Sequence, residues 1–138
     1  MDRFIVFFLL SFLLSCSNAE PSYVVGVESN FIVKVDVISV YDGDTFRGDL
    51  HLGMGIVLKN QPFRLADINA PELYDDGGRE SQEFLFNLIY DKEIYVEIVD
   101  EREKYGRILA LIYDKYEICG ENKSINHLMV EKGFAEIY

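Results

Sequence analysis

Residues 31–45 read FIVKVDVISVYDGDT, and this stretch decides the fold class of the chain. Over 31–38, apolar side chains recur at every second position, which is typical of a β-strand with one buried face. A turn rich in Asp and Gly follows at 41–44, because these residues tolerate tight and left-handed backbone conformations. The stretch therefore predicts a strand, a tight turn and a second strand that starts at Thr45.

The remaining sequence continues the same pattern and adds helices. Alternating apolar residues predict further strands over 45–52, 56–67, 94–98 and 108–113. Apolar residues at helical spacing predict a helix over Glu80–Tyr90, and Ser124 is a candidate N-cap for a short helix that ends at Gly133. The order predicts one mainly β domain of the α+β class. Five short strands are compatible with a Greek-key barrel, although periodicity does not separate a barrel from another compact sheet.

The composition excludes several classes of protein. The chain has 138 residues, of which 49% are hydrophobic and 27% charged, so it has enough apolar surface to form a core and is not disordered. Two cysteines exclude a disulfide-dense scaffold. The formal net charge of −11 argues against a protein that grips nucleic acid non-specifically over a wide basic face.

The first 19 residues have the features of an export signal. An 11-residue, almost wholly apolar run, Phe4–Leu14, follows Arg3 and is shorter than the roughly 20 residues that cross a bilayer. The next residues resemble a bacterial lipobox in which Cys16 becomes the lipidated first residue. We therefore expect a membrane-anchored lipoprotein facing the extracytoplasmic space. The alternatives are secretion after cleavage at Ala19 and an uncleaved anchor.

These boundaries give the expected domain organisation. Residues 1–19 form the signal peptide, 20–30 a spacer, and 31–138 a single folded domain that we expect to be monomeric. Cys119 then has no thiol partner within the exported chain, so we interpret it as a small packing residue.

Three short clusters carry the residues that could perform chemistry. They are Asp42–Thr45 on the first turn, Arg64–Glu72 after the third strand, and Glu103–Arg107 before the last strand. If the first three strands and the last one are neighbours, the clusters meet at one rim. Carboxylate and carbonyl oxygens on turns suit Ca²⁺, two arginines can hold a phosphate, and a further carboxylate can activate water. Together they predict phosphodiester hydrolysis.

The three clusters resemble the signatures of the staphylococcal nuclease (thermonuclease) family, in the same order. The matching strings are Asp42-Gly43-Asp44-Thr45, then Arg64-Leu65 with Pro71-Glu72, then Lys104-Tyr105-Gly106-Arg107. The resemblance covers roughly residues 35–138. It implies a five-stranded OB-fold barrel with helices, in agreement with the strands read from the sequence, and a Ca²⁺-dependent nuclease that acts on a nucleic acid.

The resemblance also implies catalytic and metal-binding roles. Arg64 and Arg107 match the two phosphate-binding arginines, and the second would help the leaving group. Glu72 matches the carboxylate that positions or activates the attacking water. The Ca²⁺ ligands match Asp44, Asn69 and the backbone carbonyl of Ala70.

Further residues match supporting positions of the family. Asp42 matches an acidic residue close to the metal ligands. Lys104 and Tyr105 match residues that line the phosphate end of the pocket. Tyr138 falls near a tyrosine that faces the base of the substrate.

Some features depart from the family pattern. Asn69 replaces an Asp, which removes one negative charge and predicts weaker Ca²⁺ binding. Asp67 is a poor substitute, because in a continuing strand it would point to the opposite face. The interval between Asp44 and Arg64 is longer than in the type enzyme and predicts an extended hairpin around 51–59.

The sequence leaves three functions open. The leading hypothesis is a Ca²⁺-dependent nuclease that cuts DNA, with RNA as a second substrate, outside the cytoplasm. The second is a catalytically weakened or inactive OB-fold binding module of an envelope lipoprotein, favoured by Asn69, by the net charge of −11 and by the end of the resemblance at Tyr138, where the type enzyme continues. The third is a purely structural lipoprotein domain.

Overall fold

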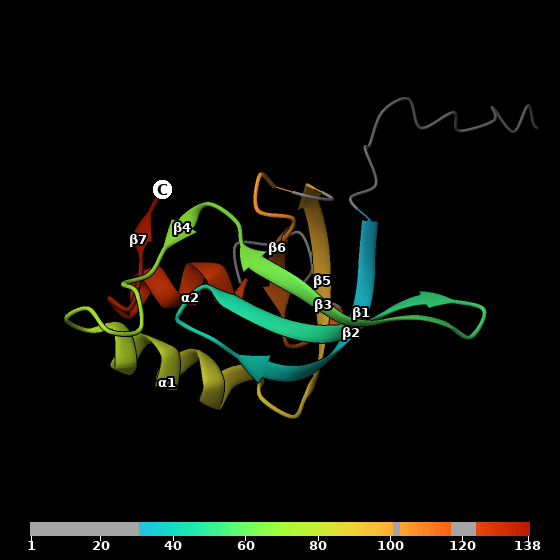
Figure 1. The fold of residues 1–138 in the computed structure, drawn as a ribbon, viewed down its shortest axis with the longest axis horizontal. Helices are drawn as coiled ribbons and strands as arrows, with labels where there is room; N and C mark the ends of the chain where they lie inside the picture. Colours follow the sequence, from blue (N-terminus) through green and yellow to red (C-terminus); the bar gives the residue numbers. More distant parts are fainter. Residues whose placement is uncertain (1–30, 101–102, 117–123) are drawn as a thin grey trace, which may run out of the picture.

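The computed structural model describes most of the region predicted to form the folded domain (Figure 1). The described residues are 31–100, 103–116 and 124–138. The predicted signal peptide, its lipidation site Cys16, the spacer over 20–30 and the packing role of Cys119 lie outside them. In this part of the chain, no helix has both the length and the apolar character needed to cross a membrane.

Five strands form a closed barrel, which confirms the predicted fold class (Figure 1). The neighbours around the barrel follow the order β1-β2-β3-β6-β5, and β5 pairs back with β1. The β3–β6 pair is parallel, and the other pairs are antiparallel. The strands are β1 (Phe31–Val40), β2 (Thr45–Gly53), β3 (Ile56–Leu65), β5 (Glu93–Asp100) and β6 (Ile108–Tyr113).

The alternation seen in the sequence becomes the inside and outside of the barrel. Val33, Val35 and Val37 of β1 are buried, whereas the charged residues between them lie nearer solvent. Phe46 of β2 and Phe63 of β3 stack inside the barrel with ring centroids 4.9 Å apart. Burial of one face of each strand therefore stabilises the barrel and fixes the strand register.

Two helices pack against the barrel, α1 (Gly78–Ile89) and α2 (Ile125–Glu131). The second begins as predicted, because the Ser124 hydroxyl accepts a hydrogen bond from the His127 backbone N–H at 3.2 Å. The first begins two residues before the predicted start, directly after Gly77, whose φ of +79° favours glycine. Gly78 also requires glycine, because a Cβ there would lie 2.7 Å from the backbone carbonyl carbon of Glu72.

The predicted strand over 56–67 is two residues too long. It ends at Leu65, and Asp67 adopts a left-handed φ of +59°, which turns the chain. A separate two-stranded sheet follows, in which β4 (Ile68–Asn69) pairs with β7 (Glu136–Ile137) near the C-terminus (Figure 1). Asp67 therefore does not lie on a continuing strand. The prediction that its side chain would point to the opposite face, and would for that reason be a poor substitute for Asn69, was wrong on this point.

Asn126 ties α2 to the barrel, although nothing in its local sequence indicated this role. Its buried side chain accepts a hydrogen bond from the Ile112 N–H at 3.0 Å. It also donates to the carbonyl oxygens of Ala66 at 3.0 Å and Ala110 at 2.9 Å. One amide group therefore satisfies backbone atoms at the end of β3 and in β6, where the chain leaves the barrel towards the site.

Asn126→Ala is expected to lower the free energy of unfolding by about 3 kcal/mol, because buried backbone groups lose their hydrogen-bond partners. Chemical denaturation followed by circular dichroism measures this change. The matched control is Asn87→Ala, at an exposed position of α1, where a change within about 0.5 kcal/mol is expected. Equal stability of the two variants would contradict the role given to Asn126.

Candidate active site

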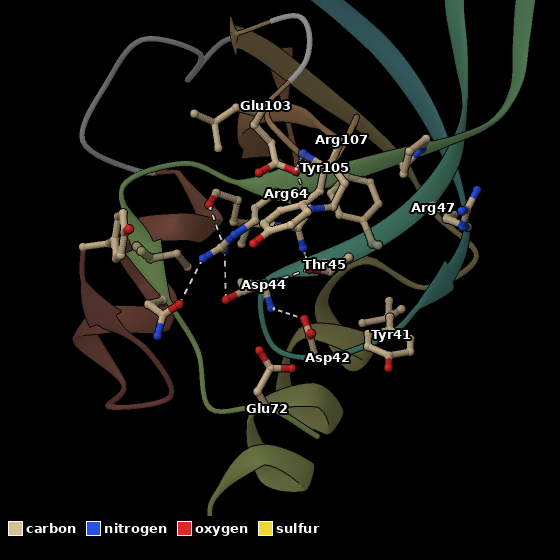
Figure 2. Close-up of a pocket in the computed structure, with 18 of the residues that line it drawn as sticks. Tyr41, Asp42, Asp44, Thr45, Arg47, Arg64, Glu72, Glu103, Tyr105 and Arg107 are labelled. Atoms are coloured by element: carbon tan, nitrogen blue, oxygen red, sulfur yellow. Dashed lines mark hydrogen bonds and ion pairs between the residues drawn. The ribbon is translucent and has the colours of Figure 1, made fainter. Parts of the chain in front are cut away.

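The three clusters meet at one rim of the barrel, around a cavity of about 910 Å³ (Figure 2). The first comes from the β1–β2 turn, the second from the end of β3 and the segment after it, and the third from the β5–β6 connection. The predicted site residues that line the cavity are Asp42, Asp44, Arg64, Asn69, Glu72, Lys104, Tyr105, Arg107 and Tyr138. Of the predicted site residues that the structure describes, Ala70 is the one that does not line it, and it is buried.

The β1–β2 turn is built to hold two carboxylates close to the barrel. The Asp42 side chain accepts a hydrogen bond from the Asp44 backbone N–H at 3.0 Å, which closes the turn. Gly43 allows the turn to lie against the neighbouring segments, because a Cβ there would come within 2.7 Å of the Ala70 Cβ and 2.8 Å of the Ser81 Cβ. Both carboxylates are consequently buried.

Asp44 joins the first two clusters of the site. Its Oδ2 accepts a hydrogen bond from the Ala70 N–H at 2.8 Å and pairs with Arg64 Nη1 at 2.9 Å. Its Oδ1 accepts a hydrogen bond from the Thr45 hydroxyl at 3.0 Å. Three donors therefore share a carboxylate that offers about four lone-pair positions.

Arg64 links two of the predicted metal ligands. Besides its ion pair with Asp44, it donates from Nη2 to Asn69 Oδ1 at 3.0 Å. Its side chain is largely buried, so the guanidinium is held in place next to the cavity. In this arrangement the positive charge of Arg64 compensates the buried charge of Asp44.

Arg107 lies above Asp44 and Thr45 in Figure 2, on the same side as Arg64. Its Nε donates to Glu103 Oε1 at 2.9 Å, and its Nη1 donates to the Thr45 hydroxyl at 3.2 Å. Burial lowers the pKa of Arg107, but the hydrogen bond and charge of Glu103 outweigh burial and raise it, so Arg107 stays charged. The same hydrogen bond lowers the pKa of Glu103.

Lys104, Tyr105 and Tyr138 lie at the mouth of the cavity. The Lys104 ammonium lies 4.8 Å from the centre of the Tyr105 ring, and the Arg107 guanidinium carbon lies 5.5 Å from it. Tyr138 is exposed, and its backbone N–H donates to the Asp67 carbonyl at 3.0 Å. Tyr138 is thus brought to the site by the turn at Asp67.

Thr45 and Glu103 lie within the clusters, but no role for either was predicted from the sequence. The structure shows that both bind Arg107, Thr45 from the start of β2 and Glu103 from the β5–β6 connection. The ion pair of Glu103 with Arg107 could have been predicted, because Glu103 lies four residues before Arg107 and a glycine turn separates them. No local pattern could indicate Thr45, because its contact with Arg107 joins residues 62 apart.

Asp42 has a perturbed titration with a clear cause. Burial raises its pKa, the nearby charge of Asp44 raises it further, and the hydrogen bond from the Asp44 N–H opposes these effects in part. The net result is a pKa of about 6. At neutral pH the turn therefore holds two adjacent negative charges, which a cation would stabilise.

The chemistry of the donors fits a hard cation such as Ca²⁺, which prefers oxygen ligands. The cavity offers the carboxylates of Asp42, Asp44 and Glu72 and the amide oxygen of Asn69. No three His, Cys, Asp or Glu side chains of the described residues are grouped closely enough to hold a metal ion. Neutral oxygens from Asn69 and the backbone would therefore have to complete the site, and this predicts low affinity.

Residues 62–138 match the family described as staphylococcal nuclease homologue. The chain belongs to this family. Among curated proteins, the chain is 31% identical over 108 residues to a micrococcal nuclease of Shigella flexneri. It is 32% identical over 102 residues to an uncharacterized endonuclease of Escherichia coli and 30% identical over 106 residues to one of Haemophilus influenzae.

These alignments cover most of this chain but a smaller share of its relatives. They include 75%, 74% and 74% of this chain, respectively. They span 57%, 59% and 51% of the lengths of the three relatives. The comparison therefore establishes the family, and the recognition of that family from the three clusters is confirmed.

The raised pKa of Asp42 makes the stability of the fold depend on pH. The folded protein binds a proton more tightly than the unfolded chain, whose Asp pKa is 3.8, so stability falls as pH rises from about 4 to about 6. Asp42→Asn removes this penalty and keeps an oxygen for the Asp44 N–H. We expect the variant to melt at a higher temperature than the wild type above pH 6 and equally below pH 4, in the presence of a chelator.

The control for this prediction is Asp76→Asn, at an exposed position near the start of α1. Its melting temperature should follow that of the wild type across the whole pH range. A constant difference between Asp42→Asn and the wild type from pH 4 to pH 8 would show that Asp42 does not titrate in this window.

Proposed function

We propose that the protein is a Ca²⁺-dependent nuclease that hydrolyses phosphodiester bonds of DNA, with RNA as a second substrate. The observation that carries the proposal is that two arginines, a buried carboxylate and an exposed carboxylate line one cavity: Arg64, Arg107, Asp44 and Glu72. The apolar run over 4–14 supports export, so we place the activity outside the cytoplasm as part of the proposal.

Arg64 would bind the phosphate from one side. A calcium ion held by Asp44, Asn69 and the carbonyl of Ala70 would supply positive charge next to the phosphate oxygens. Because Arg64 bonds the side chains of both Asp44 and Asn69, it would turn towards the phosphate when their oxygens take up the cation. The guanidinium would then stabilise the charge that gathers on the phosphate.

Arg107 would bind the same phosphate from the other side. Its hydrogen bonds to Glu103 and Thr45 use two of its five N–H donors and fix its orientation. The remaining donors can reach the phosphate and support the departing oxygen. Since its pKa is raised, Arg107 would act as a fixed positive charge and not as a proton donor.

Glu72 would orient and deprotonate the attacking water. It lies on the opposite side of Asp42 and Asp44 from the two arginines in Figure 2. Glu72 is exposed and lines the cavity, so solvent reaches its carboxylate. A carboxylate placed across the cavity from the phosphate-binding arginines is suited to act as a general base.

The second candidate function is a binding module without catalysis. Asn69 in place of a carboxylate and the ion pair between Arg64 and Asp44 favour it, because both weaken the attraction for a cation. Such a module would still bind phosphates through Arg107 and Lys104. Cleavage assays separate the two functions.

The purified full chain is expected to cleave single-stranded DNA at millimolar Ca²⁺ and to stop when a chelator is added. Glu72→Gln should lower kcat by about 100-fold or more through loss of the base. Arg107→Ala should lower kcat by about 100- to 1,000-fold through loss of charge stabilisation. Initial rates with a fluorescent oligonucleotide measure both effects.

Matched controls are available on α1, outside the cavity: Glu80→Gln and Arg79→Ala. Both should keep the activity of the wild type. A folded wild-type chain that binds the oligonucleotide but does not cleave it at millimolar Ca²⁺ would reject the nuclease and support the binding module.

Asn69→Asp is expected to tighten Ca²⁺ binding by about tenfold, because the affinity of oxygen sites rises with the number of ligand charges. Isothermal titration calorimetry with Ca²⁺ alone measures the dissociation constant without any need for activity. Asp76→Asn serves as a control for charge outside the cavity. An unchanged titration for Asn69→Asp would remove residue 69 from the set of ligands.

A further inference from the structure

The cavity extends beyond the groups used above, along the outer face of the barrel. Besides the predicted site residues, its lining includes Ser39, Tyr41, Arg47 and Pro62. These residues come from β1, β2 and β3 and from the turn between β1 and β2. None of them has a part in the proposed cleavage.

The strand register places these residues in a second row beside the proposed catalytic row. Thr45 pairs with Arg64, and two residues further along β2, Arg47 pairs with both Pro62 and Ser39. Phe46 between them points into the core, so Thr45 and Arg47 share the outer face. Two residues along a strand span about 7 Å, a separation that neighbouring phosphates of an extended strand can bridge.

Arg47 supplies a positive charge in this second row. Its Nη1 donates to the Asn60 carbonyl at 2.9 Å, which leaves other N–H groups for a ligand. Within the described residues, Arg47 forms no ion pair with a carboxylate, whereas Arg64 and Arg107 both do. An exposed arginine that lines the cavity of such an acidic chain is suited to bind a phosphate.

Tyr41 supplies an aromatic surface on the same side of the cavity as Arg47. It is 63% exposed and lines the cavity. In Figure 2, Tyr41 and Arg47 lie on the same side of Thr45, away from Arg64. An exposed ring beside a cation is the combination that binds single-stranded nucleic acids, because the ring stacks on a base while the cation holds the backbone.

The row after Arg47 is occupied by paired charges. Asp49, two residues further along β2, pairs with Lys59 at 2.6 Å and accepts the Asn60 N–H at 2.9 Å. Beyond it, His51 contacts Asp36 at 2.7 Å. The basic groups beyond Arg47 therefore each contact a carboxylate, and we limit the inferred subsite to one nucleotide.

We infer that Arg47, Tyr41 and Pro62 form a subsite for one nucleotide next to the cleaved phosphodiester, with Arg47 on its phosphate and Tyr41 stacked on its base. This inference rests on the proposed function, and it requires an unpaired base, because a base must leave the duplex to stack on Tyr41. The β2–β3 face and the first loop are also where OB-folds in general bind oligonucleotides.

The test measures binding and not cleavage. Fluorescence anisotropy with labelled thymidine oligonucleotides of one to four residues is recorded in Ca²⁺, with the full chain carrying Glu72→Gln. Affinity should rise by about tenfold when the second nucleotide is added and then level off. In the same background, Arg47→Ala should remove most of this gain. It should also reduce the slope of the logarithm of the binding constant against the logarithm of the salt concentration by about one, the change expected for the loss of one phosphate contact.

Further variants separate a loss of stacking on Tyr41 from a non-specific loss of binding. Tyr41→Ala should also remove most of the gain with length, whereas Tyr41→Phe keeps the ring and should retain it. Arg79→Ala removes an arginine outside the cavity and should leave the gain unchanged. An equal loss of affinity for all lengths in Arg47→Ala, or no loss, would overturn the subsite.

The outcome also distinguishes this inference from the proposed function. If the chain with Glu72 intact fails to cleave but Arg47→Ala still abolishes the gain with length, the nuclease is rejected and the subsite stands. If the chain cleaves and Arg47→Ala binds every length as its parent does, the nuclease stands and the subsite is rejected.

Discussion

Asp44 accepts hydrogen bonds from the Ala70 N–H and the Thr45 hydroxyl and forms an ion pair with Arg64. The rest of the site depends on this one buried carboxylate. It fixes the β1–β2 turn against the segment after β3, and through Thr45 it reaches Arg107 on the far connection. A buried carboxylate requires such partners, because an unpaired charge inside a protein is very unfavourable.

The same constraint explains how an acidic chain can present a surface for phosphates. Its arginines at the cavity are few, and each has a separate position: Arg64 contacts Asp44, Arg107 contacts Glu103, and Arg47 has no carboxylate partner among the described residues. Two are oriented by the acids beside them, and the third is free to meet a ligand. A net charge of −11 therefore opposes binding over a wide face but is compatible with a short track of placed arginines.

Local sequence predicted the elements better than their ends. The barrel strands followed from alternation, and the Ser124 cap of α2 followed from its side chain, because both depend on neighbours along the chain. The strand ending at Leu65 was predicted two residues too long, because the left-handed turn at Asp67 is stabilised by partners far along the chain. Asn126 was missed for the same reason, since its three hydrogen bonds join α2 to distant backbone atoms.

By itself, the sequence determined the fold class, the family and which three clusters carry the chemistry, since periodicity and short motifs are local properties. Only the tertiary structure decided how the clusters face one another. It placed Arg64 between Asp44 and Asn69, held Arg107 through Thr45 and Glu103, and set Arg47 in a second row on the same cavity. These contacts join residues far apart along the chain, so they arise from strand register and barrel closure, which no local pattern specifies.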